Sequence, residues 1–71
     1  MSKFKEGDKV RVLNNSETEH LQKETGWQII GATGKIEGVG TMYLGKFCQY
    51  IILGNGALVR IPEEDLVKVE S

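Results

Sequence analysis

Residues 47–61 read FCQYIILGNGALVRI, two apolar segments joined by the pair Asn55-Gly56. Asparagine followed by glycine between apolar runs is typical of a tight β-hairpin, because both residues accept positive φ angles. The first segment, residues 47–53, is rich in aromatic and β-branched side chains, which predicts a strand with both faces largely covered. The second segment, residues 57–61, is the returning strand, so the stretch predicts an antiparallel pair.

Downstream of this hairpin, the sequence predicts one tight turn and one further strand. Pro62 ends the returning strand, because proline has no N–H with which to continue the ladder. Residues 62–65 read PEED and suit a single 3₁₀ turn, since acidic side chains are favoured where a helical turn begins. Residues 66–69 read LVKV and predict a short final strand.

Upstream of the hairpin, residues 34–43 predict one strongly bent strand. Glycines within this segment let the backbone turn sharply, which is how a short sheet curls onto itself. Residues 8–13 alternate charged and apolar side chains, so they predict a half-buried strand with Val10 and Val12 facing inward. We expect this first strand to pair with the bent one.

A long connection separates the first strand from the bent one. Ser16 and Glu19 match the spacing of a capping box, with Ser16 as the N-cap. This pattern predicts a helix of about two turns over residues 17–24 that ends at Gly26. Because Leu21 is the one large apolar residue between positions 14 and 26, we expect this part of the chain to be mobile or ordered by a partner.

The composition is that of one small globular domain spanning residues 1–71. Hydrophobic residues make up 39% of the chain and charged residues 27%, which argues against disorder. Nine basic and ten acidic residues give a formal charge of −1, whereas a dedicated nucleic-acid binder usually carries a basic excess. A local basic cluster near the N-terminus is interpreted as solvation and edge protection of the first strand. It consists of Lys3, Lys5, Lys9 and Arg11.

Several classes of protein are not favoured by the sequence. The longest apolar run, residues 50–53, is far shorter than the roughly 20 residues of a membrane-spanning helix. Charged residues near the N-terminus replace the apolar stretch of a secretion signal, so we expect a cytoplasmic protein that does not bind membranes. Cys48 is the single cysteine and is expected to be a small buried hydrophobe. His20 has no metal-ligand spacing around it, and we expect neither a metal nor a cofactor.

The predicted strands fit a closed or nearly closed five-stranded barrel, because closure removes the exposed edges of so small a sheet. Three segments resemble Src-homology-3-like barrels of bacterial type. They read GDKVRV at residues 7–12, GATGKI at residues 31–36 and PEEDLVKV at residues 62–69. The similarity is to KOW-motif domains of ribosomal and transcription proteins. It extends to electron-transport accessory domains, among them a small stromal component of photosystem I and the ferredoxin–thioredoxin reductase variable chain. The resemblance implies an all-β, five-stranded Src-homology-3-like barrel with a long, part-helical loop between its first two strands.

Five side chains are candidates for a binding surface. They are Trp27, Tyr43, Lys46, Arg60 and His20. Trp27 lies where the long connection meets an apolar segment, either as a plug at the mouth of the barrel or as an aromatic platform for a ligand. Arg60 stands between two apolar residues of a strand, so it is expected to point outward and to contact an anion or a carboxylate. His20 lies on a helix face rich in glutamate, which is typical of a solvated surface.

We expect the binding surface where the long connection meets the turn around residues 43–46, with Trp27 at its centre. The function expected from these observations is that of a small non-catalytic binding module rather than an enzyme. A protein–protein adaptor, or a regulatory or accessory protein of bacterial or phage origin, is favoured. The alternative is a binder of a ligand such as a nucleotide, or of nucleic acid, with the pocket at a homo-oligomeric interface.

Overall fold

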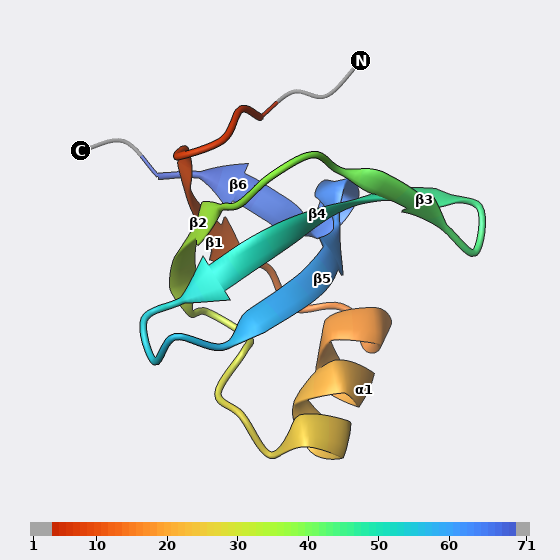
Figure 1. Cartoon of the computed structure of the whole chain (residues 1–71). Helices are drawn as coiled ribbons and strands as arrows, with labels where there is room; N and C mark the ends of the chain where they lie inside the picture. Colours follow the sequence, from red (N-terminus) through yellow and green to blue (C-terminus); the bar gives the residue numbers. More distant parts are fainter. Residues whose placement is uncertain (1–3, 70–71) are drawn as a thin grey trace.

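The computed structural model describes residues 4–69, which form a six-stranded antiparallel sheet and one α-helix (Figure 1). In chain order the elements are β1 (Lys9–Val12), α1 (Ser16–Thr25), β2 (Thr33–Ile36), β3 (Thr41–Tyr43), β4 (Lys46–Leu53), β5 (Leu58–Pro62), the 3₁₀ turn η1 (Glu63–Asp65) and β6 (Leu66–Lys68). The mostly-β architecture predicted from the sequence is confirmed. The predicted closure is not, because β5 pairs with β4 and β6 pairs with β1 without closing the sheet.

The hairpin at Asn55-Gly56 forms as predicted. β4 and β5 pair in a continuous antiparallel register that runs from Cys48 opposite Pro62 to Ile52 opposite Leu58. In the loop, Gly56 adopts a φ of 87°, and the side-chain oxygen of Asn55 accepts a hydrogen bond from the backbone N–H of Ala57. Pro62 is the last residue of β5, in agreement with its missing N–H.

The bent strand predicted over residues 34–43 is two strands, β2 and β3, and this accounts for the sixth strand. Both pair with β4: Ile36 lies opposite Ile51, and Thr41 lies opposite Cys48. Between these positions β2–β3 has four residues where β4 has two, so the extra residues leave the ladder as a bulge. Gly38, with a φ of 76°, supplies the left-handed conformation that this bulge requires.

The core is formed by buried apolar side chains of β1, β2, β4, β5 and β6, together with Phe4 and Ile29. β1 pairs with both β2 and β6, and its inward residues Val10 and Val12 are fully buried, as their alternation predicts. They pack with the other buried apolar side chains. The largest fully buried ones are Ile29, Ile36, Ile51 and Ile61. Burying one aliphatic side chain contributes about 1.5–3 kcal/mol to the free energy of unfolding. This cluster is therefore the main source of stability in so small a chain.

The helix begins one residue earlier than the capping-box pattern predicts. The N-cap is Asn15, whose side chain accepts hydrogen bonds from the backbone of residues 17 and 18, while the hydroxyl of Thr18 accepts from the Asn15 N–H. Ser16 is the first helical residue instead of the cap. Both Ser and Asn are favoured caps, and the sequence pattern alone does not separate them. The predicted stop at Gly26 is confirmed, with a φ of 74°.

Several polar contacts, in addition to the apolar side chain of Leu21, connect α1 to the rest of the structure. Thr18 is buried, and its hydroxyl donates a hydrogen bond to the carbonyl oxygen of Leu13 at 2.9 Å. The side-chain oxygen of Gln22 accepts from the backbone N–H groups of Ile29 and Ile30, each at 3.0 Å. Leu21 packs against the core as expected. A count of apolar residues does not detect polar contacts of this kind, and the expectation of a mobile segment rests on such a count.

Gly34 in β2 provides a direct test of how closely the strands pack. An added Cβ atom would lie 2.6 Å from both a methyl group of Ile51 and the backbone oxygen of Ile52. Because the backbone oxygen cannot move aside without breaking the ladder, we expect Gly34→Ala to lower the free energy of unfolding by about 1–3 kcal/mol. Urea denaturation measures this change. Gly54→Ala is the matched control, since nothing lies within 4 Å of its Cβ, and an equal loss in both variants would contradict the explanation.

The position of the helix cap gives a second prediction. Asn15→Ala removes the cap of α1, and we expect it to cost roughly 0.5–2 kcal/mol of unfolding free energy. Ser16→Ala leaves that cap intact and should change stability by much less. Thermal or urea denaturation of the two variants side by side decides between them. A larger loss for Ser16→Ala would instead support the capping box predicted from the sequence.

Candidate functional site

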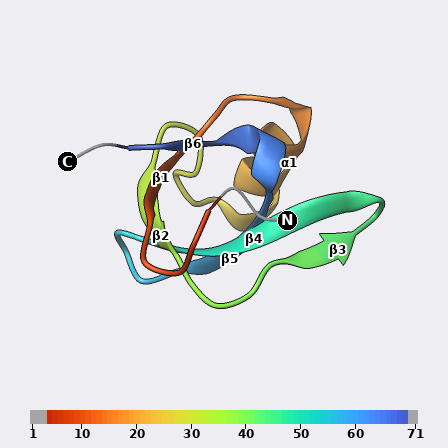
Figure 2. The ribbon, with the colours of Figure 1, turned by 90° about the horizontal axis from the view of Figure 1, so that it is seen from above.

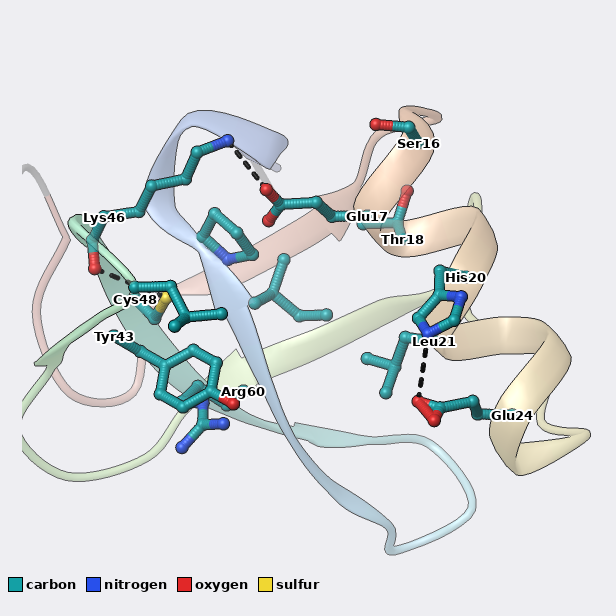
Figure 3. Close-up of a pocket in the computed structure, with 13 residues that line it drawn as sticks. Ser16, Glu17, Thr18, His20, Leu21, Glu24, Tyr43, Lys46, Cys48 and Arg60 are labelled. Carbon is teal, nitrogen blue, oxygen red and sulfur yellow. Dashed lines mark hydrogen bonds and ion pairs between the residues drawn. The ribbon is translucent and has the colours of Figure 1, made fainter.

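A groove of about 470 Å³ lies between α1 and the sheet, where the β3–β4 hairpin and β5 face the helix (Figure 3). Four of the five predicted binding residues line it. They are His20 on α1, Tyr43 on β3, Lys46 on β4 and Arg60 on β5. The groove therefore gathers side chains that are up to 40 positions apart in the sequence, through the contact of the helix with the hairpin.

Trp27 is the fifth predicted residue, and it does not line this groove. Its side chain is 40% exposed and does not belong to the buried core cluster. Its backbone N–H donates a hydrogen bond to the hydroxyl of Thr25 just after the helix. The structure thus places Trp27 apart from the groove that holds the other four side chains, and it does not plug the core.

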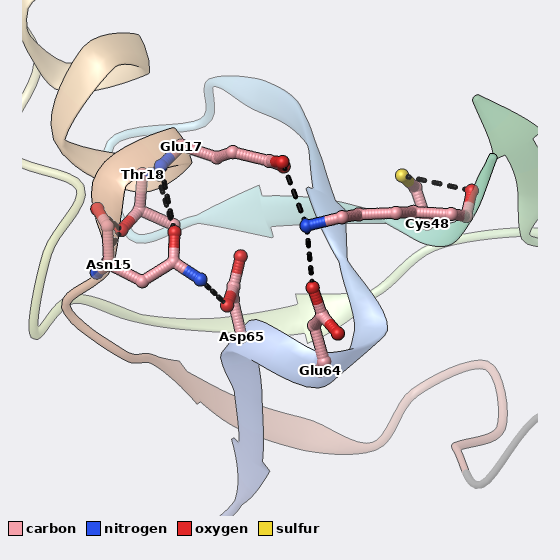
Figure 4. Close-up of polar contacts among 7 residues, drawn as sticks. Asn15, Glu17, Thr18, Cys48, Glu64 and Asp65 are labelled. Atoms are coloured by element: carbon pink, nitrogen blue, oxygen red, sulfur yellow. Dashed lines mark hydrogen bonds and ion pairs between the residues drawn. The ribbon is translucent and has the colours of Figure 1, made fainter. Parts of the chain in front are cut away.

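Lys46 joins three elements at one end of the groove (Figure 3). Figure 4 shows its two partners, Glu17 on α1 and Glu64 on η1. Its ammonium group lies 2.9 Å from a carboxylate oxygen of Glu17 on α1 and 2.7 Å from one of Glu64 on η1. The hydrogen bond to Glu17, followed by that to Glu64, raises the pKa of Lys46 above its usual range. These partners neutralise the lysine charge within the protein. Lys46 consequently positions the helix against the sheet and is not a free cation for a ligand.

Arg60 and Tyr43 form the wall of the groove that lies across from α1 (Figure 3). The Arg60 guanidinium stacks over the Tyr43 ring, 3.5 Å from the ring centroid, in a cation–π contact. Both side chains are exposed, and Arg60 points outward as its place in the strand predicts. The stack gives this wall of the groove a mixed aromatic and cationic character, and a guanidinium group is suited to carboxylate or carbonyl acceptors.

The helix side of the groove is polar and solvated. His20 lies 3.4 Å from Glu24 one turn further along α1, and both side chains are largely exposed. A second pair, Glu19 with Lys23 at 3.6 Å, lies on the same helix. Exposed pairs of this kind contribute little to stability. The solvated helix face expected from the sequence is therefore what surrounds His20.

Apolar groups form the floor of the groove. Cys48, Leu21 and Ile61 line it, and Cys48 is buried as its apolar neighbourhood predicts. Burial raises the pKa of the Cys48 thiol, so the sulfur stays protonated near neutral pH. Its Sγ donates a weak hydrogen bond to the Lys46 carbonyl oxygen at 3.7 Å. A protonated, buried thiol is a poor nucleophile, and the chemistry of the floor is that of apolar contact.

Asp65 is the residue of this region that sequence reasoning missed. The 3₁₀ turn expected over residues 62–65 forms as η1, and its last residue, Asp65, is only 3% exposed. One carboxylate oxygen accepts a hydrogen bond from the Asn15 side chain, and the other has no hydrogen-bond partner among the described residues. Burial is the main cause that raises the pKa of Asp65. No local signal could reveal this contact, because Asn15 and Asp65 are 50 positions apart.

Other kinds of site receive no support within residues 4–69. No group of three or more His, Cys, Asp or Glu side chains is arranged to hold a metal ion there. The described helix α1 is too short and too polar to cross a membrane. Of the basic cluster near the N-terminus, Lys3 lies outside the described residues, while Lys5, Lys9 and Arg11 are exposed. Comparison of the chain with protein-family models, with curated proteins and with solved structures gives no match.

The buried carboxyl group of Asp65 predicts a pH dependence of stability. Its raised pKa means that the folded chain holds the proton more tightly than the unfolded chain. This contribution to stability is complete below the pKa of the unfolded chain and is lost as pH rises through the folded value. Asp65→Asn keeps an oxygen for Asn15 and cannot ionise. We expect the wild type to lose unfolding free energy relative to Asp65→Asn as pH rises from about 3 through the raised pKa of the carboxyl group, as measured by urea denaturation. A difference independent of pH would contradict the assignment.

Proposed function

We propose that this chain is a small non-catalytic binding module that holds a segment of a protein partner in the groove between α1, the β3–β4 hairpin and β5. The observation that carries the proposal is the meeting of four candidate side chains from four elements around one apolar floor. An apolar floor with a few polar groups at the rim is the usual make-up of a recognition site. The Arg60–Tyr43 stack supplies the two residue types that are most enriched at binding hot spots besides tryptophan.

The strand order supports a Src-homology-3-like barrel as the class of fold. β1 lies between β2 and β6, β4 lies between β2 and β5, and the 3₁₀ turn η1 leads from β5 into β6. In this class the inward side chains fill a small core, so recognition is left to loops and one outer face. The connection between β1 and β2 contains α1, which forms one wall of the groove.

The charges around the groove favour a protein segment over a nucleotide or nucleic acid. Glutamates on α1 and η1 surround it, and the Lys46 ammonium is already paired with two of them. Besides Lys46, the basic side chains that line the groove are Arg60, which lies over an aromatic ring, and His20, which is paired with Glu24. Phosphate groups are bound by several unpaired cations or by oriented backbone N–H groups. The first turn of α1 does line the groove, but its Glu17 and Thr18 N–H groups already donate to the Asn15 side chain.

The test is a selection of peptides from a random displayed library, followed by titration of the selected peptide into isotope-labelled protein. We expect chemical-shift changes centred on residues 43–48 and 60–61 and on the facing side of α1. Tyr43→Ala and Arg60→Ala should each weaken binding by about tenfold, which corresponds to about 1.4 kcal/mol for one hot-spot side chain. Leu58→Ala is the matched control, because Leu58 is exposed on the same strand and does not line the groove.

Two outcomes would contradict this function. Shift changes centred on Trp27, together with loss of binding in Trp27→Ala but not in Tyr43→Ala, would move the surface to the place predicted from the sequence. Binding of ATP or of a single-stranded oligonucleotide, used as phosphate probes, with shift changes at the groove would favour the alternative class. Circular dichroism of each variant separates lost binding from lost folding.

A further inference from the structure

The edges of the sheet are protected unequally. Among the described residues, β3, β5 and β6 each pair along one side with a single strand. β5 carries Arg60 and ends in Pro62, and β6 ends in Lys68, which lies 3.8 Å from Asp8. Charged side chains and proline are the usual means by which proteins prevent edge strands from pairing with other chains. β3 has neither.

β3 lies in an apolar and uncharged part of the chain. Residues 38–45 read GVGTMYLG and contain no charged side chain and no proline. Three large apolar side chains here are strongly exposed: Val39 at 87%, Met42 at 63% and Leu44 at 84%. The hairpin that carries them extends away from β1 and β2 in both views of the ribbon (Figures 1 and 2). Exposed apolar residues on an unprotected edge mark an interaction site.

The backbone N–H and C=O of Met42 in β3 point toward the open edge of the sheet. Tyr43 lies opposite Lys46 across the two-residue turn Leu44-Gly45, in which both residues have positive φ angles of 51° and 79°. Residues that flank a two-residue hairpin turn form a hydrogen-bonded pair, and such pairs alternate along an antiparallel ladder. Met42, opposite Phe47, therefore directs its own N–H and C=O away from β4. This edge can add an antiparallel strand.

We propose that the β3 edge pairs with the β3 edge of a second copy of this chain, about a twofold axis at Met42, to form a homodimer with a continuous sheet. A copy supplies the same uncharged strand, so no like charges meet across the axis. The twofold axis uses both edges and closes the assembly at two chains. This inference goes beyond the proposed function. Tyr43 and Lys46 face the groove on positions that alternate with Met42, and Leu44, which also lines the groove, lies in the turn beyond β3, so pairing at Met42 does not use these three residues.

The first test is the mass of the chain in solution. Sedimentation equilibrium of the wild type should give twice the mass of one chain, with dissociation on dilution. Met42→Lys places two ammonium groups opposite each other across the axis and should weaken association by at least about tenfold. Val67→Lys is the matched control, since Val67 is an exposed apolar residue on β6, and it should leave the dimer unchanged. A monomer at all concentrations, or an unchanged dimer in Met42→Lys, would overturn the proposal.

The second test fixes the register. In a Cys48→Ala background, Met42→Cys brings two thiols together across the axis, at a Cα separation of about 5.5 Å that suits a disulfide. Mild oxidation should give a covalent dimer in high yield. Leu58→Cys in the same background is the control, because Leu58 is exposed on the other edge of the sheet. Equal cross-linking of the two variants would overturn the β3 interface, while peptide binding to the groove would remain a separate measurement.

Discussion

The pairing of β4 with three other strands is the constraint on which the rest of the structure depends. β5 occupies one edge of β4 along five positions, and β2 and β3 share the other edge. Because two strands must fit along one edge, the chain leaves the ladder between them as a bulge at Gly38. The same crowding requires glycine at position 34, where a Cβ atom would meet the backbone of β4. β3 pairs with β4 alone, so its other edge is unpaired, and the side chains of β3, β4 and β5 together form one wall of the groove.

The parts of the fold that could be predicted from the sequence are those with local causes. Asn55-Gly56 specifies a turn through the conformations of its own two residues, and Pro62 ends a strand through its own missing donor. The alternation around Val10 and Val12 identifies the buried face, because side-chain direction in a strand has a period of two. The split of the predicted bent strand was not visible in the same way. It depends on the register of β4, which local propensity does not encode.

The candidate site shows the same division. The outward position of Arg60 follows from its neighbours in β5, but its stack on Tyr43 depends on strand pairing. The bond between Asn15 and Asp65 joins a helix cap to a distant 3₁₀ turn, and it helps to set the place of α1 over the sheet. Trp27 follows the helix and does not line the groove, so residue type alone overestimated its part in this site. Residue type suggested five candidates for the binding surface, and the tertiary structure brings four of them together in the groove.

Three features break the local rules of stability, and all three adjoin the groove or its hairpin. Leu44 holds a left-handed conformation that costs an ordinary residue roughly 1–2 kcal/mol, and its side chain is exposed to solvent. Asp65 has a buried carboxylate oxygen without a hydrogen-bond partner among the described residues. β3 lacks the charges that protect the other edges. Natural sequences depart from local consistency mainly where function requires it. The concentration of these costs on one side of a thin core, with the hairpin at Asn55-Gly56 free of them, is a physical argument for the proposal that recognition occurs on that side.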